Sequence, residues 1–187
     1  YKDFFGLLRA VHEEAKRRDI WKQLSLAIAY STEAYVPVDI NQSPFNVGLA
    51  LELPEFTQEQ VKDLAQRHQL NWSDTEVLEL MELVGGHPFL VRLALFQIAN
   101  RNINLAHFLQ TAPTAAGIYS KHLQRQEYIL QQQPELGQAM QEIVTNDHPV
   151  ILTTEIRFKL YSLGLVKLRN DEVTPRCELY RKYFRTQ

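Results

Sequence analysis

Apolar positions near the start of the chain repeat with a helical period. Between residues 3 and 18 they fall at Phe4, Leu7, Leu8, Val11 and Ala15, and charged residues gather at the end of the segment. This spacing predicts a surface helix with one buried stripe. The next apolar run, residues 24–30 (LSLAIAY), carries no charge, which is typical of a strand buried on both faces. A helix followed by a buried strand favours an α/β layer.

Residues 31–48 then lack a regular pattern and contain several proline, asparagine and glycine residues. Long irregular loops are usually functional or disordered. A second apolar run, residues 49–53, predicts a last strand that Pro54 ends.

From residue 57 onward the pattern is helical. Two capping boxes, Thr57 with Gln60 and Ser73 with Glu76, predict helix starts, and they precede expected helices at about 57–68 and 74–84. Gly85 and Gly86 suit the end of the second helix, and Pro88 suits the first position of a helix reaching about residue 98. We expect Asn104 to cap one more short helix, to about residue 110.

A run of small residues, 111–117 (TAPTAAG), is the best candidate domain boundary in the chain. After it, the pattern predicts helices near 118–132, 135–145 and 153–163, strands at 165–168 and 172–174, and a closing helix from about 174 to 184. Three helices followed by a two-stranded ribbon is the order of a winged helix.

Composition places the chain among ordinary globular proteins. Its 187 residues are 45% hydrophobic and 22% charged, with 20 Lys+Arg against 22 Asp+Glu, which excludes disorder, collagen and a membrane span. The net charge of −2 argues against a purely electrostatic nucleic-acid binder. The single cysteine, Cys177, cannot form an internal disulfide, and the histidines lack zinc-ligand spacing, so we expect no metal site and a cytoplasmic location. The chain starts without methionine, so we expect a fragment or a processed protein.

The segment from Gly85 to Arg92 carries the most informative chemistry. Arg92 is the first charge in an otherwise apolar helix and lies four positions after Pro88, on the same face. A helix N-terminus favours an anion, so a phosphate beside Arg92 would supply a partner for the guanidinium. The alternative is that the glycines only cap a helix and that Arg92 pairs with a surface carboxylate.

Gly86-His87-Pro88 followed by an apolar helix resembles the GxP motif in the lid of STAND-class P-loop ATPases. Over its length the chain resembles the C-terminal portion of the AAA-like ATPase domains of cyanobacterial multidomain regulators. The resemblance implies that Gly86 and Pro88 contact an adenine nucleotide, that Ser31 and Thr32 sense its γ-phosphate at the end of a sensor-1 strand, and that Arg92 acts as a sensor-2 arginine. It also implies ATP or ADP with Mg²⁺ as cofactor of the intact protein.

The sequence departs from this family pattern in three respects. It contains no G-x-x-x-x-G-K-[ST] motif and no apolar strand ending in paired acids, so we expect no catalytic residues here and no ATP hydrolysis by this chain alone. Glu33 follows the sensor-1 pair where many STAND proteins have arginine.

The predicted fold class is therefore mostly α (α+β). We expect the end of an α/β nucleotide-binding core at residues 1–53, a helical lid at 54–113 and a winged helix at 114–187. The predicted function is part of an ATP-binding regulatory switch in signalling, with protein partners or self-association through the lid and winged helix. Two alternatives stay open: a DNA-binding regulator that contacts phosphates through Lys167 and Arg169, and a degenerate helical interaction scaffold.

Overall fold

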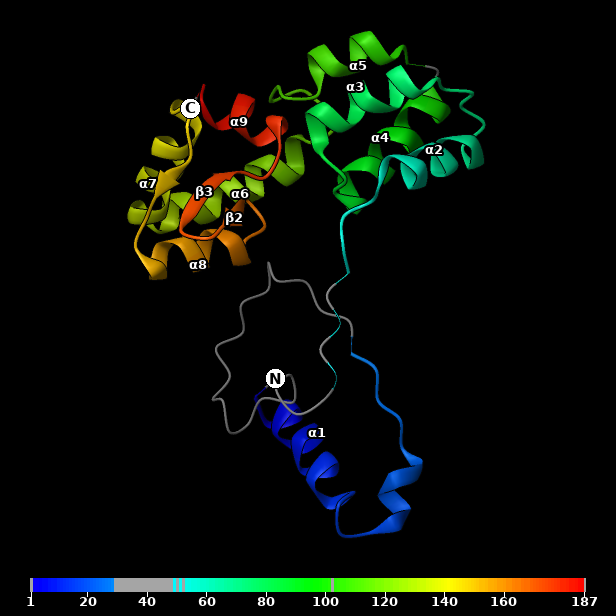
Figure 1. Cartoon of the computed structure of the whole chain (residues 1–187), viewed down its shortest axis with the longest axis vertical. Helices are drawn as coiled ribbons and strands as arrows, with labels where there is room; N and C mark the ends of the chain where they lie inside the picture. The colour runs from blue at the N-terminus through cyan, green and yellow to red at the C-terminus, as the bar shows by residue number, and fades with distance from the viewer. Residues whose placement is uncertain (1, 29–48, 50, 52, 102, 187) are drawn as a thin grey trace. The chain divides into compact units, whose positions relative to one another are not determined.

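The computed structural model describes residues 2–28, 49, 51, 53–101 and 103–186. The chain divides into two compact units, Tyr1–Pro54 and Glu55–Gln187 (Figure 1). Within the described residues, helices predominate and the sheet is small and antiparallel, which confirms the predicted mostly α (α+β) class. The further division into core, lid and winged helix stays a prediction.

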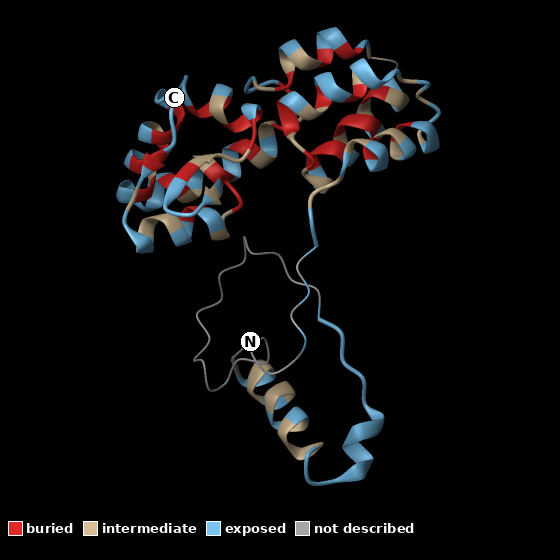
Figure 2. Cartoon of the chain, in the orientation of Figure 1, coloured by how far each residue is buried: buried red, intermediate tan, exposed pale blue. Residues whose placement is uncertain are grey.

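The first unit contains the helix α1 (Lys2–Glu14) and a 3₁₀ turn, η1 (Asp19–Gln23). The helix predicted at the start of the chain is confirmed, although it ends earlier than expected, but the prediction of a buried stripe on it is wrong: Phe4 and Leu7 are 58% and 59% exposed. None of the described side chains of this unit is buried, as the absence of red on α1 in Figure 2 shows.

The predicted strand at 24–30 is wrong over residues 24–28. These residues form no strand, and Leu24 and Leu26 are about half exposed, at 53% and 54%. A strand needs a neighbour to pair its backbone groups, and no described residue supplies one here. Residues 29 and 30 lie outside the described part of the chain.

The strand predicted at 49–53 is also absent from the described residues of this segment. Leu49, Leu51 and Leu53 belong to no strand and are 77–88% exposed, while residues 50 and 52 lie outside the described part. An apolar run is therefore not enough to identify a strand, because a strand also needs a neighbour that pairs with its backbone groups.

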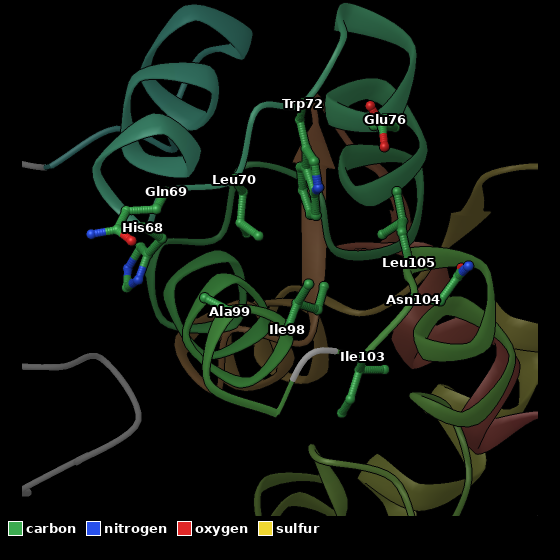
Figure 3. A pocket seen from close by; sticks show the side chains of 10 residues that line it. All are labelled: His68, Gln69, Leu70, Trp72, Glu76, Ile98, Ala99, Ile103, Asn104 and Leu105. Carbon is green, nitrogen blue, oxygen red and sulfur yellow. The ribbon is translucent and has the colours of Figure 1, made fainter.

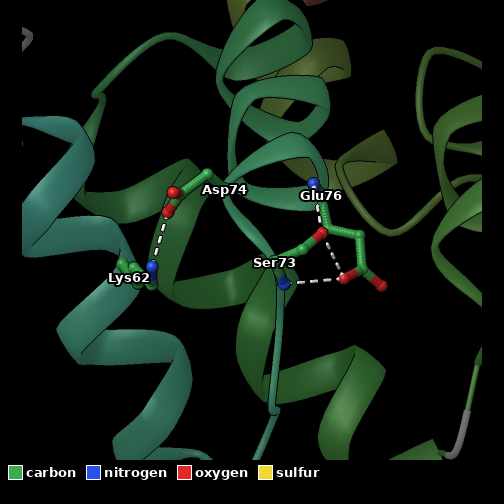
Figure 4. Close-up of polar contacts among 4 residues, drawn as sticks. All are labelled: Lys62, Ser73, Asp74 and Glu76. Atoms are coloured by element: carbon green, nitrogen blue, oxygen red, sulfur yellow. Dashed lines mark hydrogen bonds and ion pairs between the residues drawn. The ribbon is translucent and has the colours of Figure 1, made fainter.

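The second unit begins with four helices whose ends follow the predicted signals. They are α2 (Gln58–Arg67), α3 (Asp74–Val84), α4 (Pro88–Arg101) and α5 (Leu105–Thr111). Both capping boxes are confirmed: the hydroxyl of Ser73 accepts from the Glu76 amide at 3.3 Å, and the Glu76 carboxylate accepts from the Ser73 amide at 2.8 Å (Figure 4).

The rest of this unit combines helices with a three-stranded antiparallel sheet. Its elements are α6 (Ser120–Gln132), α7 (Pro134–Thr145), β1 (Val150–Ile151), α8 (Thr154–Ser162), β2 (Val166–Arg169), β3 (Glu172–Pro175) and α9 (Glu178–Phe184). The strand order is β1-β3-β2, and β2 and β3 form a hairpin in which Arg169 pairs with Glu172. The predicted hairpin is confirmed, whereas β1, which is two residues long, was not predicted.

One hydrophobic core runs through the second unit. Buried side chains from Val61 in α2 to Phe184 in α9 form a single cluster. The ribbon is red at buried residues in Figure 2. Helix α3 contacts both α2 and α9, so the core passes from the first four helices to the closing helix. None of the helices in the described part of the chain is both long and apolar enough to cross a membrane.

Candidate functional site

The turn between α3 and α4 has the local structure that its sequence predicts. Gly85 ends α3 with φ 63° and ψ −156°, a conformation open essentially only to glycine. Pro88 opens α4, where the missing N–H of proline costs nothing because the first amides of a helix have no intrahelical acceptor.

Gly86 lies in close contact with the backbone of Phe56. The Phe56 amide donates to the Gly86 carbonyl oxygen at 2.8 Å, and a Cβ atom at Gly86 would lie 2.2 Å from the Phe56 carbonyl oxygen. This position therefore requires glycine for packing within the protein. The packing explains the residue type without a ligand.

Glu55 connects this turn to the hairpin through both oxygens of its carboxylate. Oε1 accepts from Nε of Arg176 at 3.0 Å, and Oε2 lies 3.0 Å from Nζ of Lys167. Partial burial opposes ionisation of Glu55, but the two cations outweigh it and lower the pKa of the carboxyl below its usual value. Nothing in the sequence pattern around Glu55 pointed to this contact, because its partners are more than a hundred residues away.

His87 is a polar residue of the turn whose imidazole is buried, and among the described residues its Nδ1 atom has no hydrogen-bond partner. Burial, together with the positive charge of Arg176, lowers the pKa of its imidazole from 6.5 to about 4. Its Nδ1 atom is buried and accepts or donates no hydrogen bond within the described structure. The neutral form of His87 is therefore the stable one at pH 7.

Aromatic contacts join α4 to α6 and α9. The rings of Phe89 and His122 lie 5.4 Å apart, and His122 stacks on Tyr180 at 5.9 Å with an Nε2···Oη distance of 2.8 Å. The buried hydroxyl of Tyr119 donates to the Leu90 carbonyl oxygen at 2.8 Å. The start of α4 is thus directly connected to the C-terminal helices.

Arg92 lies on the outer face of α4 and is exposed. Phe89 and Phe96, at helical spacing on either side of it, are 51% and 47% exposed. No carboxylate among the described residues pairs with Arg92. The guanidinium is therefore available to an external anion. Because Arg92 is exposed, water can also solvate its charge, so the fold does not require a partner for it.

The remaining predicted site residues, and the single cysteine, fall in different situations. Ser31 and Thr32 lie outside the described residues. Lys167 is engaged by Glu55, whereas Arg169 is exposed on the hairpin. Cys177 is buried, and burial raises the pKa of its thiol to about 11, so that the thiol stays protonated and unreactive.

The second unit has two surface hollows that are lined by other residues than those predicted for the site. The one in Figure 3 measures about 420 Å³ and is lined by residues of α3, α4 and α5 and of the α2–α3 and α4–α5 connections, Trp72, Glu76, Ile98 and Asn104 among them. The other, about 410 Å³, lies beside Phe56 and Asp63. None of the predicted site residues lines either hollow. The described residues also hold no group of three metal-binding side chains.

These observations describe a mostly helical module built around a glycine-rich turn, with a small antiparallel sheet. A comparison with models of protein families matches residues 1–186 to the AAA-like domain, and the chain belongs to that family. The assignment indicates a nucleotide-binding, ATPase-like module. No curated protein and no solved structure matches the chain.

Proposed function

We propose that this chain is part of an ATP-binding regulatory switch of the STAND class, of the type found in cyanobacterial multidomain regulators. In this proposal α2–α5 form the lid, and α6–α9 with the hairpin form a winged helix whose arrangement follows the nucleotide state. The adenine nucleotide contacts Gly86 and Pro88, and Ser31, Thr32 and Arg92 sense its γ-phosphate. Mg²⁺ accompanies the nucleotide in the intact protein.

One observation carries the proposal. Helix α4 begins at Pro88, and one turn later it presents Arg92, an exposed arginine that forms no ion pair among the described residues. The helix N-terminus and the guanidinium both favour negative charge. Because Arg92 lies four residues after Pro88, the two are about 6 Å apart along the helix axis, which suits a polyphosphate.

The contacts of α4 supply a route from nucleotide to winged helix. Phe89 touches His122, and the Leu90 carbonyl oxygen accepts from Tyr119, so a shift of α4 would displace α6 directly. A γ-phosphate that binds one position of α4 better than another would bias two arrangements of the C-terminal helices.

The test is a calorimetric titration of ATP into the protein that carries these residues with its natural flanking sequence. Arg92→Ala should weaken ATP binding about tenfold, the usual scale for one charge-assisted contact. Arg101→Ala is the matched control, because Arg101 is an exposed arginine at the far end of the same helix. Equal affinity for wild type and Arg92→Ala would overturn the role of Arg92, and no binding to the wild type would overturn the nucleotide proposal.

The DNA-binding alternative gains no support from the geometry. On α8, the guanidinium of Arg157 lies 2.6 Å from a carboxylate oxygen of Asp171, and Lys159 lies 2.6 Å from Glu155. Lys167 is also paired. Cations already neutralised within the chain release fewer counterions from DNA, so only Arg169 remains of the two residues predicted to contact phosphates. The scaffold alternative would apply if the intact protein bound no nucleotide.

A further inference from the structure

The carboxylate of Glu55 joins three segments that are distant in sequence. It precedes α2, whereas Lys167 lies in β2 and Arg176 directly follows β3, 121 residues after Glu55. Each oxygen of the carboxylate has its own cation at 3.0 Å. The side chains of Glu55 and Arg176 are only 28% and 26% exposed, so solvent screens their attraction less than it screens a surface pair.

The backbone that follows Glu55 is also held in place. The hydrogen bond from the Phe56 amide to Gly86 and the close approach of the two backbones fix residues 55 and 56 against the turn between α3 and α4. A Cβ atom at Gly85 would lie 3.8 Å from Oε2 of Glu55 and 3.9 Å from the Arg176 carbonyl oxygen. The turn, Glu55 and Arg176 therefore meet at one point.

Arg176 is in turn held by the hairpin side. Its amide donates to the Leu165 carbonyl oxygen at 2.9 Å, and its Nη1 atom lies 3.2 Å from the position of a Cβ at Gly164, which has φ 73°. Arg176 is thus fixed by the segment that connects α8 with β2 before it reaches Glu55.

We propose that Glu55 is a positioning residue whose paired contacts with Lys167 and Arg176 form an electrostatic latch between the α3–α4 turn and the hairpin. While the latch is closed, the turn and the hairpin move together. When the carboxylate is neutralised, the two sides open independently of each other. The latch is a property of the second unit alone and stands whether or not a nucleotide binds at α4.

A contrasting ion pair supplies the control. Lys62 of α2 and Asp74 of α3 also form an ion pair, but the Asp74 side chain is 65% exposed and the pair bridges two neighbouring helices (Figure 4). Such a surface pair contributes little to stability. Asp74→Asn removes one carboxylate charge from the same unit, as Glu55→Gln does, without touching the latch.

The experiment measures amide hydrogen exchange in the full chain. In Glu55→Gln, the amides of Phe56 and Arg176 should exchange about tenfold faster than in wild type, because both report opening at the latch. The amide of Leu95, in the buried middle of α4, should change by less than about twofold. In Asp74→Asn, the amides of Phe56 and Arg176 should keep their wild-type rates.

Two results would overturn the latch. One is unchanged exchange at Phe56 and Arg176 in Glu55→Gln. The other is equal acceleration at Leu95, which would indicate loss of stability throughout the unit. If Glu55→Gln fails to fold, Arg176→Gln and Lys167→Gln take its place. Each should accelerate hydrogen exchange at the Phe56 amide, although both cations are far from Phe56 in the sequence. Rates at Phe56 that stay at the wild-type level in both variants would also exclude the latch.

Discussion

His87 is a residue whose protonation should affect the stability of the fold. Its pKa falls from 6.5 in the unfolded chain to about 4 in the folded protein, chiefly because it is buried. The unfolded state therefore binds a proton more readily, and the stability conferred by neutral His87 is fully present above pH 6.5 and is lost as the pH falls toward 4.

We expect wild type to lose on the order of 1–3 kcal/mol more unfolding free energy than His87→Gln over this pH window. Urea unfolding at a series of pH values measures the difference, and the other histidines and Glu55 cancel in the comparison. Parallel pH profiles for the two proteins would contradict the shifted pKa.

Gly86 should tolerate no side chain. Gly86→Ala places a methyl group against the Phe56 backbone, which cannot move as a flexible side chain could, and we expect a loss of about 3 kcal/mol or more. Gly137→Ala is the control, because Gly137 lies in α7 and its Cβ would make an ordinary contact, at 3.4 Å, with the Leu130 carbonyl oxygen of α6. Chemical denaturation should show Gly137→Ala within about 1 kcal/mol of wild type. Equal stability of the two variants would refute the close approach at Gly86.

Gln126 presents the opposite case, a polar side chain that the fold does not satisfy. It is fully buried in α6, and neither its amide nitrogen nor its carbonyl oxygen has a hydrogen-bond partner in the described part of the chain. Gln126→Met removes both polar groups at nearly equal volume and should raise the unfolding free energy by about 1–3 kcal/mol. Gln141→Met should lower it instead, because Nε2 of Gln141 donates to the Phe184 carbonyl oxygen at 2.8 Å. Thermal unfolding of both variants tests the contrast, and destabilisation by Gln126→Met would show that its polar groups have partners after all.

At the scale of elements, helix caps should matter more than surface ion pairs. Ser73 and Glu76 each satisfy an amide of the other at the start of α3. Ser73→Ala should therefore cost about 1 kcal/mol. Asp74→Asn, in the next residue, removes the pair with Lys62 and should cost about 0.5 kcal/mol or less. Denaturation curves that rank the two changes in reverse order would contradict this account.

The elements that the sequence predicted well are those with local signals. The boxes at Thr57 and Ser73, the glycine at 85 and the proline at 88 each act within four residues, so their effect can be identified without knowing the fold. The strand at 24–28 was predicted wrongly because pairing depends on a distant partner. The site divides in the same way: the α3–α4 turn and the helix carrying Arg92 were predicted, whereas the contacts of Glu55 with Arg176 and of His122 with Tyr180 depend on tertiary packing.

At the scale of the whole molecule, the buried core belongs to the second unit. Every buried hydrophobic side chain among the described residues lies between Val61 and Phe184. Residues 55–187 should therefore unfold cooperatively by themselves, with a midpoint in urea close to that of the full chain. Circular dichroism of the two proteins makes the comparison. A fragment that shows no cooperative transition would mean that the first unit contributes to the core.

The burial of Cys177 makes the natural chain a convenient background for spectroscopy. It is the one cysteine of the sequence, and its sealed, protonated thiol should resist maleimide reagents in the native state. A cysteine introduced at any exposed position can then carry a spin label or a fluorophore without prior removal of the native thiol. Label-to-label distances within the second unit, between the exposed positions Arg101 and Arg169, measured with and without ATP, would test the proposed movement of the hairpin relative to α4.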